Sequence, residues 1–186
     1  MRPLHTGPSS EGAYLELITD LDTIRRLADE RHDEFEVMRY QLELADELSD
    51  ETIDALVTEV AAPIIAAIDC TQCANCCRSL DVYLTEQDAA RLAAGIDVPL
   101  AALLDGPIER ERAQAEGEWG VFRQRPCAFL QGNLCSVYEF RPESCRIYPV
   151  FAPDFRWTLD DAIAGAGLCP IIYNVLSAMV ERVDRL

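Results

Sequence analysis

Long apolar runs and a secretory signal are both missing from this chain of 186 residues. A helix that crosses a bilayer needs roughly 18 apolar residues, and the longest apolar run, 61–68, has eight residues and contains Pro63. The opening letters MRPLHTGPSSEG have no apolar core, so they are not a secretory signal. We therefore predict a cytoplasmic protein with no membrane association and with a flexible tail at residues 1–12.

Basic residues are also scarce in this sequence. The chain has 16 basic and 33 acidic residues, a net charge of −17, and 49% of its residues are hydrophobic. Nucleic-acid binding depends on neutralising phosphates with basic side chains, so we expect no nucleic-acid partner. The length and the hydrophobic fraction suit one globular domain and exclude disorder over most of the chain.

Common catalytic signatures are absent from the sequence. It has no glycine-rich dinucleotide motif, no phosphate-binding loop, and neither an H-E-x-x-H nor a G-x-S-x-G motif. Its only histidines, His5 and His32, lie in the expected tail and on an expected helix surface. A serine–histidine–aspartate triad is therefore unexpected, and whether the protein is an enzyme stays open.

Eight cysteines form the most informative pattern in the chain. Four of them lie within eight residues, written C-T-Q-C-A-N-C-C, and the other four are single. In chain order they are Cys70, Cys73, Cys76, Cys77, Cys127, Cys135, Cys145 and Cys169. Disulfides are rare in the cytoplasm, so clustered thiols there indicate metal or redox chemistry. We predict that all eight are metal ligands; disulfides and inert buried thiols are the alternatives.

The spacing of the run fits coordination by thiolates. Cysteines two residues apart can direct both sulfurs to one ion, as in zinc and iron–sulfur sites. Cys77 directly follows Cys76, and neighbouring side chains diverge, so we expect Cys77 to serve a second metal or another edge of one cluster. Two four-thiolate sites would use all eight cysteines. The run C-x2-C-x2-C and the later Cys169-Pro170 share pieces of bacterial ferredoxin ligation, which slightly favours iron–sulfur over zinc.

These motifs resemble those of a known family. The run CTQCANCC is similar to the signature of the YkgJ-like CxxCxxCC cysteine-cluster family, whose members are described as zinc- or iron-chelating proteins. The later segment PCAFLQGNLCSVYEFRPESCRIYP is similar to that family's second block. The matching positions are Pro126-Cys127, Cys135, Tyr138, Arg141-Pro142, Cys145-Arg146 and, further on, Cys169. The resemblance covers about residues 68–170.

The resemblance implies metal chelation by the eight cysteines, with no single reaction attached. A flagellin lysine-N-methylase is similar in its cysteine cluster, so a metal-dependent redox or protein-modifying enzyme is the alternative function. No independent methyl-donor site is visible in the sequence to support that activity.

Arg141 and Arg146 lie on either side of Cys145. A thiolate cluster carries negative charge, and a nearby guanidinium can donate hydrogen bonds and offset that charge. We therefore predict that both arginines contribute to cofactor binding, with the stronger role for Arg146 because it adjoins a predicted ligand. The alternative is that each arginine pairs with a carboxylate.

The first part of the chain has helical spacing. From about residue 13 to 48 apolar residues recur in alternating steps of four and three, interrupted only at Arg31, which predicts one long helix or two with a small break. Ser49 is the expected N-cap of a second segment that continues to Ile68 and is kinked or split at Pro63. The stripe favours packing within the chain; the alternative is a protein partner or a homodimer through these N-terminal helices.

The rest of the chain is predicted to be less regular. We expect residues 80–84 to be extended, Thr85 to cap a helix ending near Gly95, and 119–155 to form turns and short extended pieces around metal rather than a regular sheet. Residues 171–185 have the spacing of a terminal helix. The predicted fold is mainly α: an N-terminal helical hairpin at 13–68, and an irregular, loop-rich cysteine-cluster metal module at 69–186 closed by a C-terminal helix, together forming one compact domain.

Overall fold

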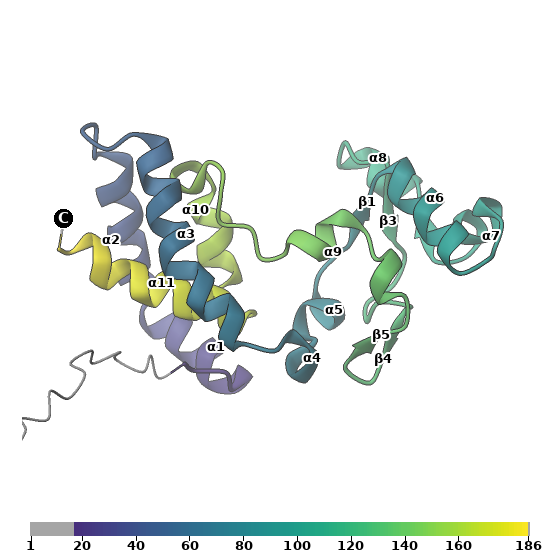
Figure 1. The fold of residues 1–186 in the computed structure, drawn as a ribbon, viewed down its shortest axis with the longest axis horizontal. Coiled ribbons are helices and arrows are strands. Elements are labelled where there is room, and N and C mark those ends of the chain that lie inside the picture. The colour runs from purple at the N-terminus through teal and green to yellow at the C-terminus, as the bar shows by residue number, and fades with distance from the viewer. Residues whose placement is uncertain (1–16, 186) are drawn as a thin grey trace, which may run out of the picture.

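Residues 17–185 are described by the structure, which is a computed structural model. The predicted tail at 1–12 lies outside this range. The fold is mainly α, as predicted, and Figure 1 shows a bundle of helices on one side, a smaller mixed lobe on the other, and the cysteine-bearing segments between them. Within the described range, no helix has both the length and the apolar character needed to cross a membrane.

The helical lobe combines helices from both ends of the described chain. They are α1 (Leu21–Glu30), α2 (His32–Glu43), α3 (Asp50–Ala67), α10 (Phe155–Gly165) and α11 (Pro170–Val183). The break between α1 and α2 falls at Arg31, and Ser49 caps α3, both as predicted. α3 continues through Pro63 and is not split there. Because α3 packs along α10 and α11, this tertiary packing outweighs the backbone hydrogen bond that proline cannot donate.

The apolar stripe of the first two helices lies in the core of this lobe. Ile24, Phe35 and Leu42 are 0–1% exposed and belong to one hydrophobic core with residues of α10 and α11. The structure therefore uses the stripe for packing within the chain. Association through the N-terminal helices stays a prediction.

The C-terminal helix packs mainly in the same core. Ile172, Leu176 and Met179 are buried, as their spacing predicts, and α11 packs chiefly against α2 and α3. Its N-cap is Cys169, so only the start of α11 reaches the cysteine-bearing segments. Residues from Phe151 onward thus pack in the core of the helical lobe. This core is therefore built from two separate stretches of the chain, and the core of the mixed lobe comes from the stretch between them.

The mixed lobe contains the second hydrophobic core and a small sheet. Its elements are β1 (Tyr83–Leu84), α6 (Glu86–Gly95), α7 (Leu100–Asp105), β2 (Ile108–Glu109), α8 (Glu111–Ala115) and β3 (Gly120–Phe122). β3 lies between β1 and β2 and is antiparallel to both, with Tyr83 opposite Val121 and Ile108 opposite Phe122. Within 119–155 the strands have only two or three residues each, in agreement with the expected short extended pieces, but the pairing of β3 with β1 and β2 was not predicted. Strands of two or three residues are too short to show a period-two pattern in the sequence.

Local signals do predict both ends of α6. Thr85 and Asp88 form a capping box at its start, and the helix ends at Gly95. A Cβ added at Gly95 would lie 2.2 Å from Cγ of Phe140, so only glycine allows the aromatic ring to approach this closely. This contact places the short 3-10 helix η1 (Tyr138–Phe140) against α6.

The cysteine region lies between the two lobes (Figure 1). It consists of α4 (Cys70–Cys73), α5 (Asn75–Ser79), β4 (Leu130–Gln131), β5 (Leu134–Cys135) and α9 (Glu143–Ile147). β4 and β5 form an antiparallel hairpin in which Leu130 lies opposite Cys135. The helices α4, α5 and α9 contain four or five residues each and bury none of them. Hydrophobic packing therefore contributes little to their position.

Candidate metal centre

The cysteine run folds as two single-turn helices separated by a sharp turn. Asp69 caps α4, because its carboxylate accepts the backbone N–H of Thr71 at 2.9 Å. Ala74, between α4 and α5, has a φ of 52°, in the left-handed region that residues with a side chain rarely adopt. The chain therefore changes direction after Cys73, and the second pair of cysteines in the run begins a new helix.

Four cysteines near α5 and the start of α11 influence one another's pKa. We call them the first cysteine group; its members are Cys70, Cys73, Cys76 and Cys169. Asn75 donates a hydrogen bond from Nδ2 to the carbonyl of Leu168 at 2.8 Å, which ties α5 to the residue before Cys169. Burial raises the pKa of Cys169, nearby N–H groups of α11 partly offset this, and the charges of Cys70 and Cys73 raise the pKa again. The sulfur from position 169 thus lies close to those of the run.

The other four cysteines influence one another's pKa, and Cys127 and Cys135 pack against the core of the mixed lobe. We call them the second cysteine group; its members are Cys77, Cys127, Cys135 and Cys145. The backbone N–H of Cys127 donates to the carbonyl of Cys77 at 2.9 Å, and the hairpin that follows carries Cys135. Burial, together with the charges of the other three thiols, raises the pKa of Cys145 to about 12. Separate segments of the chain therefore bring four sulfurs into one neighbourhood.

The two groups meet at Cys76 and Cys77, whose Sγ atoms are 4.0 Å apart. All eight cysteines are free thiols; Cys70 is exposed, Cys169 is buried and the others are half-buried. Between residues 17 and 185, no three cysteine, histidine, aspartate or glutamate side chains are already closed around one metal position. The donor set nevertheless fits a soft metal held by thiolates. Either group would have to draw its sulfurs together to bind one, and the ligand assignment stays a prediction.

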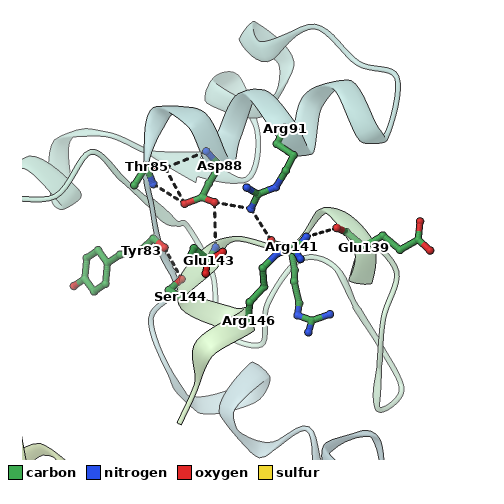
Figure 2. Close-up of polar contacts among 9 residues, drawn as sticks. All are labelled: Tyr83, Thr85, Asp88, Arg91, Glu139, Arg141, Glu143, Ser144 and Arg146. Carbon is green, nitrogen blue, oxygen red and sulfur yellow. Dashed lines mark hydrogen bonds and ion pairs between the residues drawn. The ribbon is translucent and has the colours of Figure 1, made fainter. Parts of the chain in front are cut away.

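Arg141 and Arg146 lie differently with respect to the sulfurs. Burial raises the pKa of Cys135, and the positive charge of Arg141 acts in the opposite direction on this thiol. Arg146 instead donates hydrogen bonds to the backbone carbonyls of Arg141, at 3.1 Å, and of Glu139. Figure 2 shows the side chain of Arg146 directed to the carbonyl of Glu139. The guanidinium of Arg141 donates to the carbonyl of Tyr138 at 2.8 Å and lies over the ring of that residue. The charge nearer the cysteines is thus that of Arg141, although adjacency in sequence favoured Arg146; the cofactor role of both stays a prediction.

Arg78 is a third arginine beside the cysteines, and it was not among the predicted residues. It donates to the carbonyls of Cys73, at 2.7 Å, and Gly132, at 2.9 Å. The contact with Cys76 lowers the pKa of Cys77, and the charge of Arg78 lowers it further. Arg78 directly follows Cys77, so the adjacency that singled out Arg146 could have identified Arg78 as well.

A buried carboxylate holds the start of α9, the helix that carries Cys145 (Figure 2). Asp88 is 3% exposed. Its Oδ2 accepts the N–H of Thr85 at 3.1 Å and the Thr85 hydroxyl at 2.9 Å. Its Oδ1 accepts the N–H of Glu143 at 3.0 Å and a guanidinium N–H of Arg91 at 2.7 Å. Burial raises the pKa of Asp88, but these hydrogen bonds and the charge of Arg91 outweigh it, so the net pKa is lowered and the carboxylate is ionised at neutral pH.

Tyr148 follows α9 and lies beside the first cysteine group. Burial raises the pKa of Tyr148, and the charges of Cys169 and Cys76 raise it further. The phenol is therefore neutral at neutral pH. Its ring packs against the core of the helical lobe, so this residue links that core to the cysteines.

Comparison with known proteins agrees with the cysteine pattern. Residues 69–162, slightly more than half of the chain, match the family model CxxCxxCC, which is described as "Putative zinc- or iron-chelating domain". Searches of curated proteins and of solved structures give no match. The matched range contains every cysteine except Cys169, and it contains both Arg141 and Arg146. The chain therefore belongs to the CxxCxxCC family of zinc- or iron-chelating domains.

Proposed function

We propose that this protein binds metal in two adjacent four-cysteine centres, one made by the first cysteine group and one by the second. The observation that carries the proposal is the division of the cysteines. Three members of the run interact electrostatically with the single Cys169. The fourth, Cys77, interacts in the same way with the other three single cysteines. Two sites of four thiolates use every cysteine and leave no thiol unpaired.

The arginines around the cysteines support this proposal. A site of four thiolates around a divalent ion carries a net charge of about −2, and the whole chain already has a net charge of −17. Positive charge is therefore needed close to the metal. Arg78, Arg141 and Arg146 make hydrogen bonds to backbone carbonyls. Among the described residues, none of the three has a carboxylate within ion-pair distance, so their charges are available to the thiolates.

We propose iron–sulfur clusters as the bound groups, with zinc as the alternative. The composition of the first cysteine group supports iron, because three closely spaced cysteines and a remote cysteine followed by proline are also found in bacterial ferredoxin ligation. A bound iron–sulfur cluster would supply reversible electron transfer, whereas zinc would supply structural cross-linking. The free state of all eight thiols supports action in the reducing cytoplasm.

No observation favours the alternative of a protein-modifying enzyme. The surface of the helical lobe has two shallow pockets, and Leu48 lines both. Neither of them is lined by a cysteine. The proposal is therefore limited to metal binding, with electron transfer as the function that iron would add.

The first test is the metal content of protein purified without oxygen. Visible absorption, iron, zinc and acid-labile sulfide are measured per chain. Matched iron and sulfide with a brown colour are expected; colourless protein with zinc would keep the two centres and replace the metal. Protein without either metal, from cells supplied with both, would contradict the proposal.

The second test separates the two centres. Cys73→Ser is expected to remove the metal of the first cysteine group only, Cys145→Ser that of the second only, and the double variant both. Far-UV circular dichroism of each full-length variant, which reports mainly on the helices, is the control for folding. Full metal content in both single variants would show that the ligand assignment is wrong.

A further inference from the structure

One polar connection between the mixed lobe and the cysteine region runs through Asp88. This carboxylate on α6 is almost fully buried, and each of its oxygens accepts two hydrogen bonds. Two of the donors, the N–H and the hydroxyl of Thr85, belong to the capping box of α6 itself. A capping box needs only these local contacts. The contact with Glu143, 55 residues further along the chain, is additional and indicates that Asp88 has a second structural role.

That contact fixes the first residue of α9. Glu143 begins the helix, and its N–H, which has no partner within a helix of this kind, points to Oδ1 of Asp88 at 3.0 Å. Beside it, the hydroxyl of Ser144 donates to the carbonyl of Tyr83 at 2.7 Å. Arg91, paired with Asp88, also donates to the carbonyl of Arg141 at 3.0 Å. Figure 2 shows that these contacts converge on the start of α9.

The position of α9 decides where Cys145 lies. A helix of five residues has little stability of its own, and α9 buries none of its residues. The other three members of the second cysteine group have separate supports, which are the backbone bond between Cys127 and Cys77 and the β4–β5 hairpin. Cys145 depends instead on the contacts at the start of α9, two residues before it.

We propose that Asp88 is a positioning residue of the second metal centre: by binding the N–H of Glu143 it holds α9 so that Cys145 faces the other three sulfurs. The proposal rests on the two-centre function proposed above. Asp88 touches neither sulfur nor metal in this role, and it acts through the backbone of α9. Groups that orient a metal ligand in this way typically change metal affinity by about 10–100-fold when they are lost.

The test removes only the donor of this contact. Pro142 has φ −54° and ψ 156°, a conformation that a following proline favours, and position 143 is the first helical residue, where proline is tolerated. Glu143→Pro therefore deletes the N–H while keeping the helix. Glu143→Ala is the matched control, because it removes the same side chain and retains the N–H. Neither variant changes a cysteine.

Zinc(II) is loaded onto metal-free protein, and bound zinc per chain is measured against increasing concentrations of a competing chelator. For Glu143→Pro, we expect one centre with unchanged resistance to the chelator and one weakened about 10–100-fold. The wild type and Glu143→Ala are expected to retain both centres. Equal affinities in the two variants, or equal weakening of both centres, would overturn the positioning role. A wild type that holds no zinc here and neither iron nor zinc when purified without oxygen would instead refute the proposed function, so the two failures are distinguishable.

If Glu143→Pro does not fold, Asp88→Asn provides the same readout. The amide keeps the size of the side chain and places an NH2 group where one of the oxygens accepted hydrogen bonds. Glu86→Gln, in the exposed first turn of the same helix, is its control. Selective weakening of one centre in Asp88→Asn alone supports the proposal, and unchanged affinity for both centres contradicts it.

Discussion

The helical lobe and the cysteine region are stabilised by different interactions. α11 buries nine residues, and side chains as large as Phe35 and Phe155 are completely buried in the helical lobe. In the cysteine region, α4, α5 and α9 bury none; caps and long-range hydrogen bonds hold them in place. Apolar burial is the main favourable term in folding. The helical lobe is therefore stabilised by apolar burial that the cysteine region lacks. Metal binding would supply the missing stabilisation in the cysteine region.

Removing the metal is the change with the largest expected effect. In small thiolate sites the free energy of metal binding, about 10–16 kcal/mol for zinc-finger peptides, becomes folding free energy. Chelation should therefore release the cysteine region while the helical lobe keeps its helices. Amide hydrogen exchange with and without a chelator measures this difference: α4, α5 and α9 should lose protection, and α3 and α11 should retain it. Equal loss in both regions would contradict the comparison.

A large-to-small substitution in the core of the helical lobe should have the opposite effect: it should lower the stability of that lobe and leave metal binding unchanged. Phe155 is 0% exposed and lies in edge contact with Phe151, their ring centroids 6.3 Å apart. Phe155→Ala should lower the free energy of unfolding by about 3–5 kcal/mol, with metal content per chain unchanged. Chemical denaturation and metal analysis measure the two quantities. Trp157→Ala, at a 61% exposed position of the same helix, is the control and should have a much smaller effect.

A smaller effect is expected where the mixed lobe contacts the loop that precedes α9. Gly95→Ala would place a Cβ 2.2 Å from the ring of Phe140, and overpacking of this kind costs about 1–3 kcal/mol. Thermal unfolding of the single variants and of the double variant with Phe140→Ala tests this. Once the ring is removed, Gly95→Ala should be neutral or stabilising, because alanine favours helix more than glycine does. The same destabilisation in both backgrounds would show that the ring is not the cause.

Features that depend on neighbouring residues were predicted well. The N-caps Ser49 and Thr85, the break at Arg31 and the end of α6 near Gly95 all appear in the structure. Each depends on interactions within about one helical turn, so the residues that decide it are adjacent in the sequence. Pro63 shows the limit of this reasoning, because packing with α10 and α11 keeps α3 continuous despite a local signal for a break.

Features that depend on distant residues were not predicted. The pairing of β1 with β3 joins positions 83 and 121, and strands this short have no sequence period to reveal it. The contact of Asp88 with Glu143 looks, from the sequence, like an ordinary capping residue and an ordinary acidic residue. Adjacency to Cys145 favoured Arg146, yet folding directs Arg146 to backbone carbonyls and brings the charge of Arg141 closer to the thiols.

The sequence by itself determined the chemistry of the candidate site: eight thiols, their spacing in the run, the arginines near them and the family to which the chain belongs. Only the tertiary structure supplies the contacts on which the proposed division of the thiols into two groups of four rests. The contacts responsible join Asn75 to Leu168, Cys77 to Cys127, and Asp88 to Glu143. Partners this far apart along the chain are brought together by the tertiary structure, because packing of the lobes sets the path of the segments between them.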